Sequence, residues 1–103
     1  MIVMLNETYP ISAAIEVAKI FVEELKTNPH PDYMQMLGLY AHWGGDGIVV
    51  YAYYQIEDGK VDEGVKDLTS RELKFASVDG YKVQFQVVLP VAEALALVGM
   101  EIP

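Results

Sequence analysis

The chain has 103 residues, of which 52% are hydrophobic and 21% are charged. This length predicts a single domain over residues 1–103 with one modest core. Its 15 acidic and 7 basic side chains give a net charge of −8, which argues against binding to nucleic-acid phosphates or to anionic lipid. The sequence has no cysteine, so disulfides, thiolate catalysis and Cys-ligated metals are excluded.

The N-terminal sequence MIVMLNETYP lacks the basic start and apolar run of a secretory signal. No apolar run reaches the roughly 20 residues that a membrane-spanning helix needs. We therefore expect a cytoplasmic protein with no membrane partner, and the absence of cysteine is compatible with that location.

The first third of the chain predicts a strand, a helix and a loop. Residues 2–7 begin as a continuous apolar run, which is typical of a buried strand, and residues 8–10 end it. Residues 12–26 carry apolar side chains at helical spacing, with Ser12 as the expected N-cap. Residues 27–32 contain two prolines and form a loop.

The segment 36–56 predicts a β-hairpin whose turn is the Gly-rich stretch 44–47. If Trp43 pairs with Ile48, apolar or aromatic residues lie on both faces of the hairpin. We therefore expect each face to pack against another part of the protein or against a partner. One face carries Leu37, Leu39, Ala41, Trp43, Ile48, Val50, Ala52, Tyr54 and Ile56, and the other carries Met36, Gly38, Tyr40, His42, Val49, Tyr51, Tyr53 and Gln55.

The last part of the chain predicts a helix, a strand and a short final helix. Residues 61–76 carry apolar side chains at helical spacing, and the charged residue Glu72 interrupts this apolar stripe. Residues 81–89 alternate as a strand does. Pro90 can open a short helix that ends at Gly99.

The predicted element order is that of the ferredoxin-like α+β fold, βαββαβ with a short C-terminal helix. Such a fold has a four-stranded antiparallel sheet with both long helices on one face. The opposite face would then expose Tyr40, His42, Tyr51 and Tyr53, an aromatic patch of a kind that proteins usually cover. We therefore expect a homodimer in which two sheets pack face to face.

This layout resembles the dimeric α/β-barrel superfamily of small ferredoxin-like domains. The resemblance covers nearly the whole chain as element order, and its most local part is VDGYKVQFQVVLPVAEALALVGM, residues 78–100. This ending is similar to that of an uncharacterised branch of small bacterial and archaeal members. The residue sets of the heme-degrading and quinol-forming monooxygenase branches are not found, so no functional residue is carried over.

Two residues are candidates for catalysis. His42 lies near the hairpin turn and could act as a general base, although a histidine packed among interface tyrosines is the commoner case. Glu7 could line a pocket with Tyr40 or Tyr53 and act as a base with a raised pKa, although a Glu at a strand end more often points to water. Tyr51 completes the tyrosine cluster, which either packs a dimer or binds a small ligand.

Other classes of site find little support in the sequence. His30 lies between two prolines in a loop that we expect to be exposed, and the two histidines lack metal-ligand spacing. No metal is therefore expected. No cofactor is expected either, and the GGDG turn lacks the lysine and helix of a phosphate-binding loop. The tyrosines at 51 and 53 lack the basic and glycine neighbours of an RNA-recognition strand.

Three functions follow as hypotheses. The first is a small dimeric α/β-barrel domain that binds or regulates a small molecule. The second is a cofactor-independent enzyme, monooxygenase- or isomerase-like, that acts on a small aromatic or carbonyl compound. The third is a ligand-sensing module of the ACT type, which shares the element order but usually has a glycine where this chain reads ETYPIS.

Overall fold

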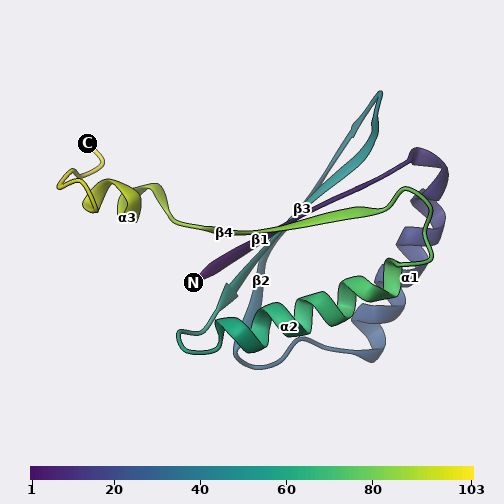
Figure 1. Ribbon diagram of the computed structural model, residues 1–103, viewed down its shortest axis with the longest axis horizontal. Coiled ribbons are helices and arrows are strands. Elements are labelled where there is room, and N and C mark those ends of the chain that lie inside the picture. Colours follow the sequence, from purple (N-terminus) through teal and green to yellow (C-terminus); the bar gives the residue numbers. More distant parts are fainter.

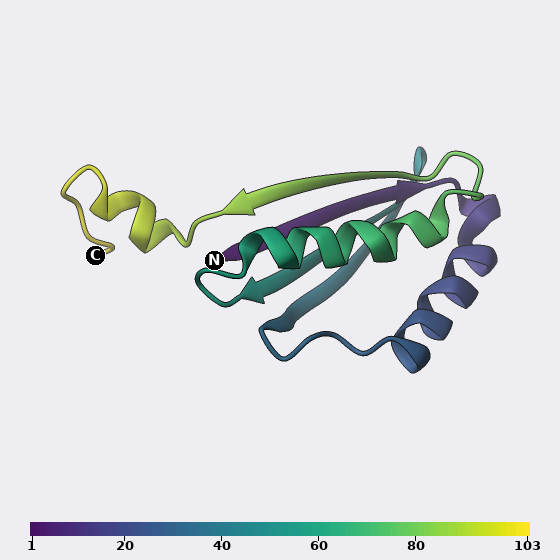
Figure 2. The ribbon, with the colours of Figure 1, turned by 60° about the horizontal axis from the view of Figure 1, so that its bottom comes forward.

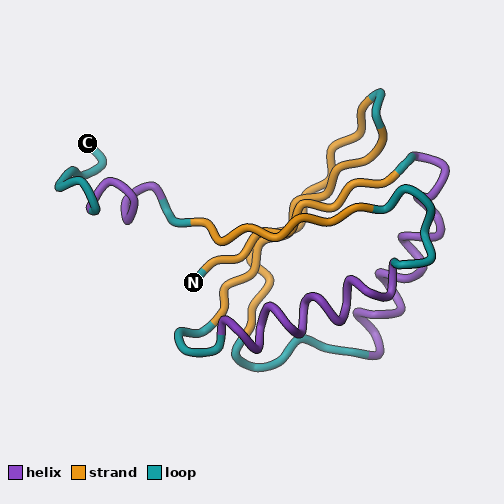
Figure 3. Tube along the Cα trace, in the orientation of Figure 1, coloured by secondary structure: helices purple, strands orange, loops and turns teal.

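The computed structural model describes all residues, Met1–Pro103, and it confirms the α+β fold (Figures 1 and 3). Its four strands form one antiparallel sheet in the order β2-β3-β1-β4. The elements are β1 (Ile2–Tyr9), η1 (Ile11–Ala13), α1 (Ala14–Thr27), β2 (Met34–Gly44), β3 (Gly47–Ile56), α2 (Val61–Glu72), η2 (Leu73–Phe75), β4 (Lys82–Val88) and α3 (Val91–Ala96).

Figure 2 shows α2 lying along the central strands of the sheet, and the main core fills the layer between them. Val3 and Leu5 alternate inward along β1, and Ile56 and Leu68 close the layer from β3 and α2. Gly64 lets α2 come close to the sheet, because a Cβ added there would lie 2.6 Å from the Cδ1 atom of Ile56. Gly64 is therefore a packing residue of α2.

A second, smaller core joins the two helices at one end of the sheet. It contains Ala13 and Val17 near the start of α1, and Phe75 and Val78 after α2. Because α1 packs mainly at this end, it does not cover the edge strand β2 (Figure 2). Trp43 remains 61% exposed on the helix side of β2, so the expectation of a fully covered core face is wrong at this edge.

The hairpin has the predicted pairing of Trp43 with Ile48. Its turn is the predicted stretch 44–47, in which Gly44 pairs with Gly47 and only two residues lie between them. A register shift between Met36 and Gly38 moves Met36 onto the core face. The predicted faces of Met36 and Leu37 were therefore wrong, because an unpaired residue reverses the alternation of a strand.

The ends of two elements also differ from the prediction. β1 continues to Tyr9, which pairs with Ile48, because the long hairpin offers a partner beyond Glu7. Ser12 is not an N-cap, since it lies within the 3-10 turn and α1 begins after Ala13 without a side-chain cap.

The C-terminal segment leaves the sheet beyond β4 and projects away from the other helices (Figures 1 and 2). Pro90 precedes α3, and Gly99 adopts a positive φ of 75° after it, as the sequence predicted for a short terminal helix. Most of the large apolar side chains in this segment are exposed, namely Leu89, Val91, Leu97, Val98, Met100 and Ile102. No helix of the protein is both long and apolar enough to cross a membrane.

Candidate functional site

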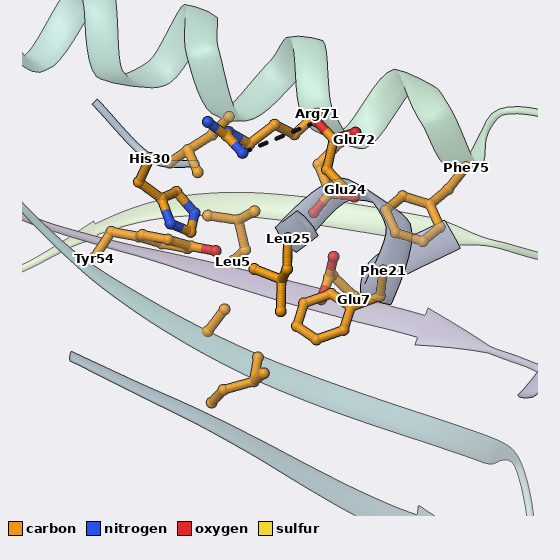
Figure 4. A pocket seen from close by; sticks show the side chains of 13 residues that line it. Leu5, Glu7, Phe21, Glu24, Leu25, His30, Tyr54, Arg71, Glu72 and Phe75 are labelled. Atoms are coloured by element: carbon orange, nitrogen blue, oxygen red, sulfur yellow. Dashed lines mark ion pairs between the residues drawn. The ribbon is translucent and has the colours of Figure 1, made fainter. Parts of the chain in front are cut away.

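A polar cavity lies between the two cores, enclosed by the sheet, α1 and α2 (Figure 4). Its volume is about 40 Å³, which is enough for ordered water but not for a larger ligand. Leu5 and Leu68 form its apolar floor, whereas Glu7, Arg71 and Glu72 bring charge to it. Charged side chains in such a place need partners, since burial without a partner is costly.

Glu7 and Glu72 are linked through the hydroxyl group of Tyr81. The Tyr81 Oη atom lies 2.6 Å from Glu7 Oε2 and 2.5 Å from Glu72 Oε2. A phenol carries one O–H hydrogen, so it can donate to only one of the two carboxyl groups. The other contact requires a hydrogen on the carboxyl group, and the three side chains therefore share one additional proton.

The additional proton belongs on Glu72. Burial, a hydrogen bond with Glu7 and the charge of Glu7 raise the pKa of Glu72 to about 9. Burial and the charge of Glu7 likewise raise the pKa of Tyr81 far above its usual value, so the phenol stays protonated. The chain of donors thus runs from Glu72 to Tyr81 to Glu7, which is left as the ionised carboxylate.

Aromatic stacking holds Tyr81 in this orientation. Its ring stacks on Phe75 with a centroid distance of 4.7 Å, and on Tyr9 with a distance of 6.0 Å. The three rings come from β1, η2 and the approach to β4. Because Tyr9 lies two residues after Glu7 on the same face of β1, the alternation of that strand places both the ring and the carboxylate at Tyr81.

Arg71 is buried, with 7% of its surface exposed, and it ties α2 to the end of α1. Its Nε atom donates to Asp67 over 2.7 Å, and its guanidinium also donates to the backbone carbonyls of Asn28 and Pro29. Its Nη1 atom lies 3.9 Å from Glu24 Oε1. All three guanidinium nitrogen atoms of Arg71 thus have partners, and no ion pair joins Arg71 to Glu7.

His30 reaches this cavity, so the prediction of an exposed loop histidine is wrong. The ring is half-buried, lines the cavity and lies 5.3 Å from the ring of Tyr54. Burial and the nearby charge of Arg71 lower the pKa of His30, against an opposing effect of Asp67. The loop is drawn inward by the hydrogen bonds that Arg71 makes to the preceding carbonyls.

An apolar groove of about 290 Å³ adjoins the cavity. It runs between α1 and the β2–β3 side of the sheet, where the helix leaves the edge strand uncovered. Apart from Glu7, every residue that lines it is aliphatic or aromatic: Tyr9, Val17, Ala18, Phe21, Leu39, Tyr40, Ala41, Val50 and Phe75. Glu7 is thus the one ionised group at the groove, and it is shared with the polar cavity.

The structure brings together only part of the residues singled out in the sequence. Glu7 and Tyr40 line the same groove. Tyr51, Tyr53 and His42 lie on the opposite face of the sheet, where Tyr40 and Tyr53 also meet edge to face with ring centroids 6.4 Å apart. His42 is exposed and lines neither the cavity nor the groove.

Sequence reasoning missed Glu72, Tyr81 and Arg71 as members of the site. The position of Glu72 within an apolar helical stripe was the signal that could have identified it. For Tyr81 the only signal was its place on the core-facing alternation of the last strand. Arg71 gave no signal, because one arginine in an exposed-looking stretch of helix is ordinary.

No known protein-family model and no curated protein sequence matches this chain. No three His, Asp or Glu side chains lie close enough together to hold a metal ion. The resemblance to the dimeric α/β-barrel superfamily therefore stays a prediction.

Proposed function

We propose that the protein is a homodimeric domain that binds a small molecule in the groove between α1 and the sheet. The observation that carries the proposal is an apolar groove whose lining contains a single carboxylate, Glu7. Small-molecule sites combine apolar walls with a few fixed polar groups, and their volumes begin at about 300 Å³. The groove has this composition and lies close to that size.

Apolar side chains on the sheet and on α1 face each other across the groove and support it as a binding site. Leu39 is 40% exposed although it lies on the core side of the sheet. Phe21 faces the same space from α1. Apolar surfaces that face each other across a gap gain free energy when an apolar molecule replaces the water between them.

A groove-filling variant tests the proposal. Ala18 is exposed on α1 and lines the groove, so Ala18→Phe would occupy the space without disturbing a buried contact. Ile15→Phe is the matched control, because Ile15 is on the same helix, 73% exposed and outside the groove. In a ligand-observed NMR screen of small apolar compounds, we expect hits for the wild type and the control that are lost in Ala18→Phe. Hits that survive in Ala18→Phe would place binding elsewhere.

The homodimer is supported by the composition of the open sheet face. Its strand residues include tyrosines, aliphatic residues and uncharged amides, with Lys82 as the one lysine and no carboxylate, although the chain has 15 acidic residues. Depletion of charge and enrichment in tyrosine are typical of interface cores. The exposed apolar segment after β4 extends from the same sheet and supplies further surface for a second copy.

A second candidate function is proton transfer, favoured by the chain from Glu72 through Tyr81 to Glu7. In this version Glu7 takes a proton from the carbon next to a carbonyl group, and the proton returns to the opposite face of that carbon or to a neighbouring carbon, which is an isomerisation. The test is exchange of that hydrogen for deuterium in heavy water, followed by NMR over a panel of small carbonyl compounds. Exchange that is equal in the wild type and Glu7→Gln would remove this candidate.

A further inference from the structure

The charge of Glu7, which lines both the groove and the adjoining cavity, is not balanced by the protein. Glu7 and Glu72 share one additional proton through Tyr81 and therefore carry one negative charge together. The other charged or titratable groups at the adjoining cavity are Glu24, His30, Arg71 and Tyr54, and burial raises the pKa of Tyr54 so that its phenol stays neutral. Glu24 adds negative charge, and a half-buried neutral histidine adds none.

No cation of the chain is free to pair with Glu7. Arg71 is engaged by Asp67, by Glu24 and by two backbone carbonyls. All six lysines are exposed, and none lines the groove or the cavity: Lys19, Lys26, Lys60, Lys66, Lys74 and Lys82. A carboxylate with one phenol donor and no cation is under-compensated in such surroundings.

The aromatic lining also suits a cation. Tyr9, Phe21 and Phe75 are the aromatic residues that line the groove from the helix side of the sheet, and the faces of aromatic rings attract positive charge. Their apolar surface can in turn cover a small hydrocarbon body. An anionic ligand would meet Glu7 as a like charge in a site of low polarity, which is unfavourable.

We propose that the groove selects small apolar amines, which place the protonated amino group on Glu7 and the hydrocarbon body against the aromatic walls. This inference rests on the proposed function, because it names the ligand class of the same groove. The ammonium group would complete the hydrogen bonding of Glu7, whose other partner is Tyr81.

Three compounds with a phenyl ring on a short chain test the selection: phenylethylamine, phenylethanol and phenylpropionate. Titration calorimetry or ligand-observed NMR on the wild type should rank the amine about tenfold tighter than the alcohol, with the carboxylate weakest. In Glu7→Gln the amine should bind only as well as the alcohol. Glu16→Gln is the matched control, since Glu16 is exposed on α1 and should leave the ranking unchanged.

The outcomes separate this inference from the proposed function. If the alcohol or the carboxylate binds the wild type as tightly as the amine, and Ala18→Phe abolishes that binding, the groove is a site but its selection for amines is refuted. If none of the three compounds binds the wild type, both proposals fail. Because the ranking is measured on the wild type, a folding defect in Glu7→Gln would not prevent the test.

Discussion

At the scale of single residues, Glu72 links the stability of the protein to pH. Its pKa rises from an ordinary 4.5 to about 9 on folding, so the folded state holds a proton that the unfolded state releases. Where the folded state binds more protons, stability falls as pH rises. The favourable contribution of Glu72 is therefore complete below about pH 4.5 and is lost progressively up to about pH 9.

Glu72→Gln should remove this dependence. The amide can still donate a hydrogen bond to Tyr81 and carries no charge, so near pH 8 the variant should gain about 1–2 kcal/mol in the free energy of unfolding. This range is well below the full pKa shift, because Glu72 is partly exposed and solvent screens it. Urea unfolding between about pH 7 and pH 9 avoids the range in which His30 titrates. If the free energy of unfolding changed equally with pH in the wild type and in Glu72→Gln, this would show that Glu72 ionises normally.

Part of this site could be predicted from single residues. Val3, Leu5 and Glu7 share one face of the first strand by alternation, so an inward Glu7 was predictable once the strand was known to continue to Tyr9. The interruption of the apolar stripe by Glu72 was visible in the sequence. That these two acids meet at the hydroxyl of Tyr81, 74 residues after Glu7, depends on strand pairing, which single-residue patterns do not give.

At the scale of elements, Arg71 connects α2 with the chain that leaves α1. Replacing it by Met keeps the apolar stem but removes the donors to Asn28 and Pro29 and leaves Asp67 without its partner. We expect Arg71→Met to lower the free energy of unfolding by about 3 kcal/mol. Lys74→Met is the control, because Lys74 is exposed nearby and should cost little.

Hydrogen exchange adds a local readout to the Arg71 prediction. Amides near residues 28–34 should lose protection in Arg71→Met, because the loop is then no longer fixed to α2. Unchanged protection in this loop, with a stability equal to that of Lys74→Met, would show that Arg71 does not anchor it.

The elements themselves follow from periodicity, and their exceptions have physical causes. The helices, the hairpin and its Trp43–Ile48 register were predicted correctly. The bulge at Leu37 was missed because one unpaired residue leaves no mark in an apolar run. The open edge at β2 was missed because the amphipathic pattern of α1 gives the side that packs but not the angle at which the helix crosses the sheet.

At the scale of the whole molecule, the open sheet face predicts association of two copies. Gln84→Glu places a carboxylate on this face, next to Asn6 in the register, and two copies would meet with added like charges. Sedimentation at micromolar concentration should show a dimer for the wild type and a shift toward monomer for Gln84→Glu. Ser70→Glu adds the same charge on the exposed side of α2 and should remain dimeric. A stable monomeric wild type would contradict the homodimer.

Ligand-induced NMR shifts mapped on the wild type test binding in the groove most directly. On addition of phenylethylamine, we expect the largest shifts at the groove, in residues such as Ala18, Phe21, Leu39 and Ala41, and at Glu7. Tyr51 and Tyr53 on the opposite face should change little. Shifts concentrated on the tyrosine face, or no shifts at all, would contradict the account.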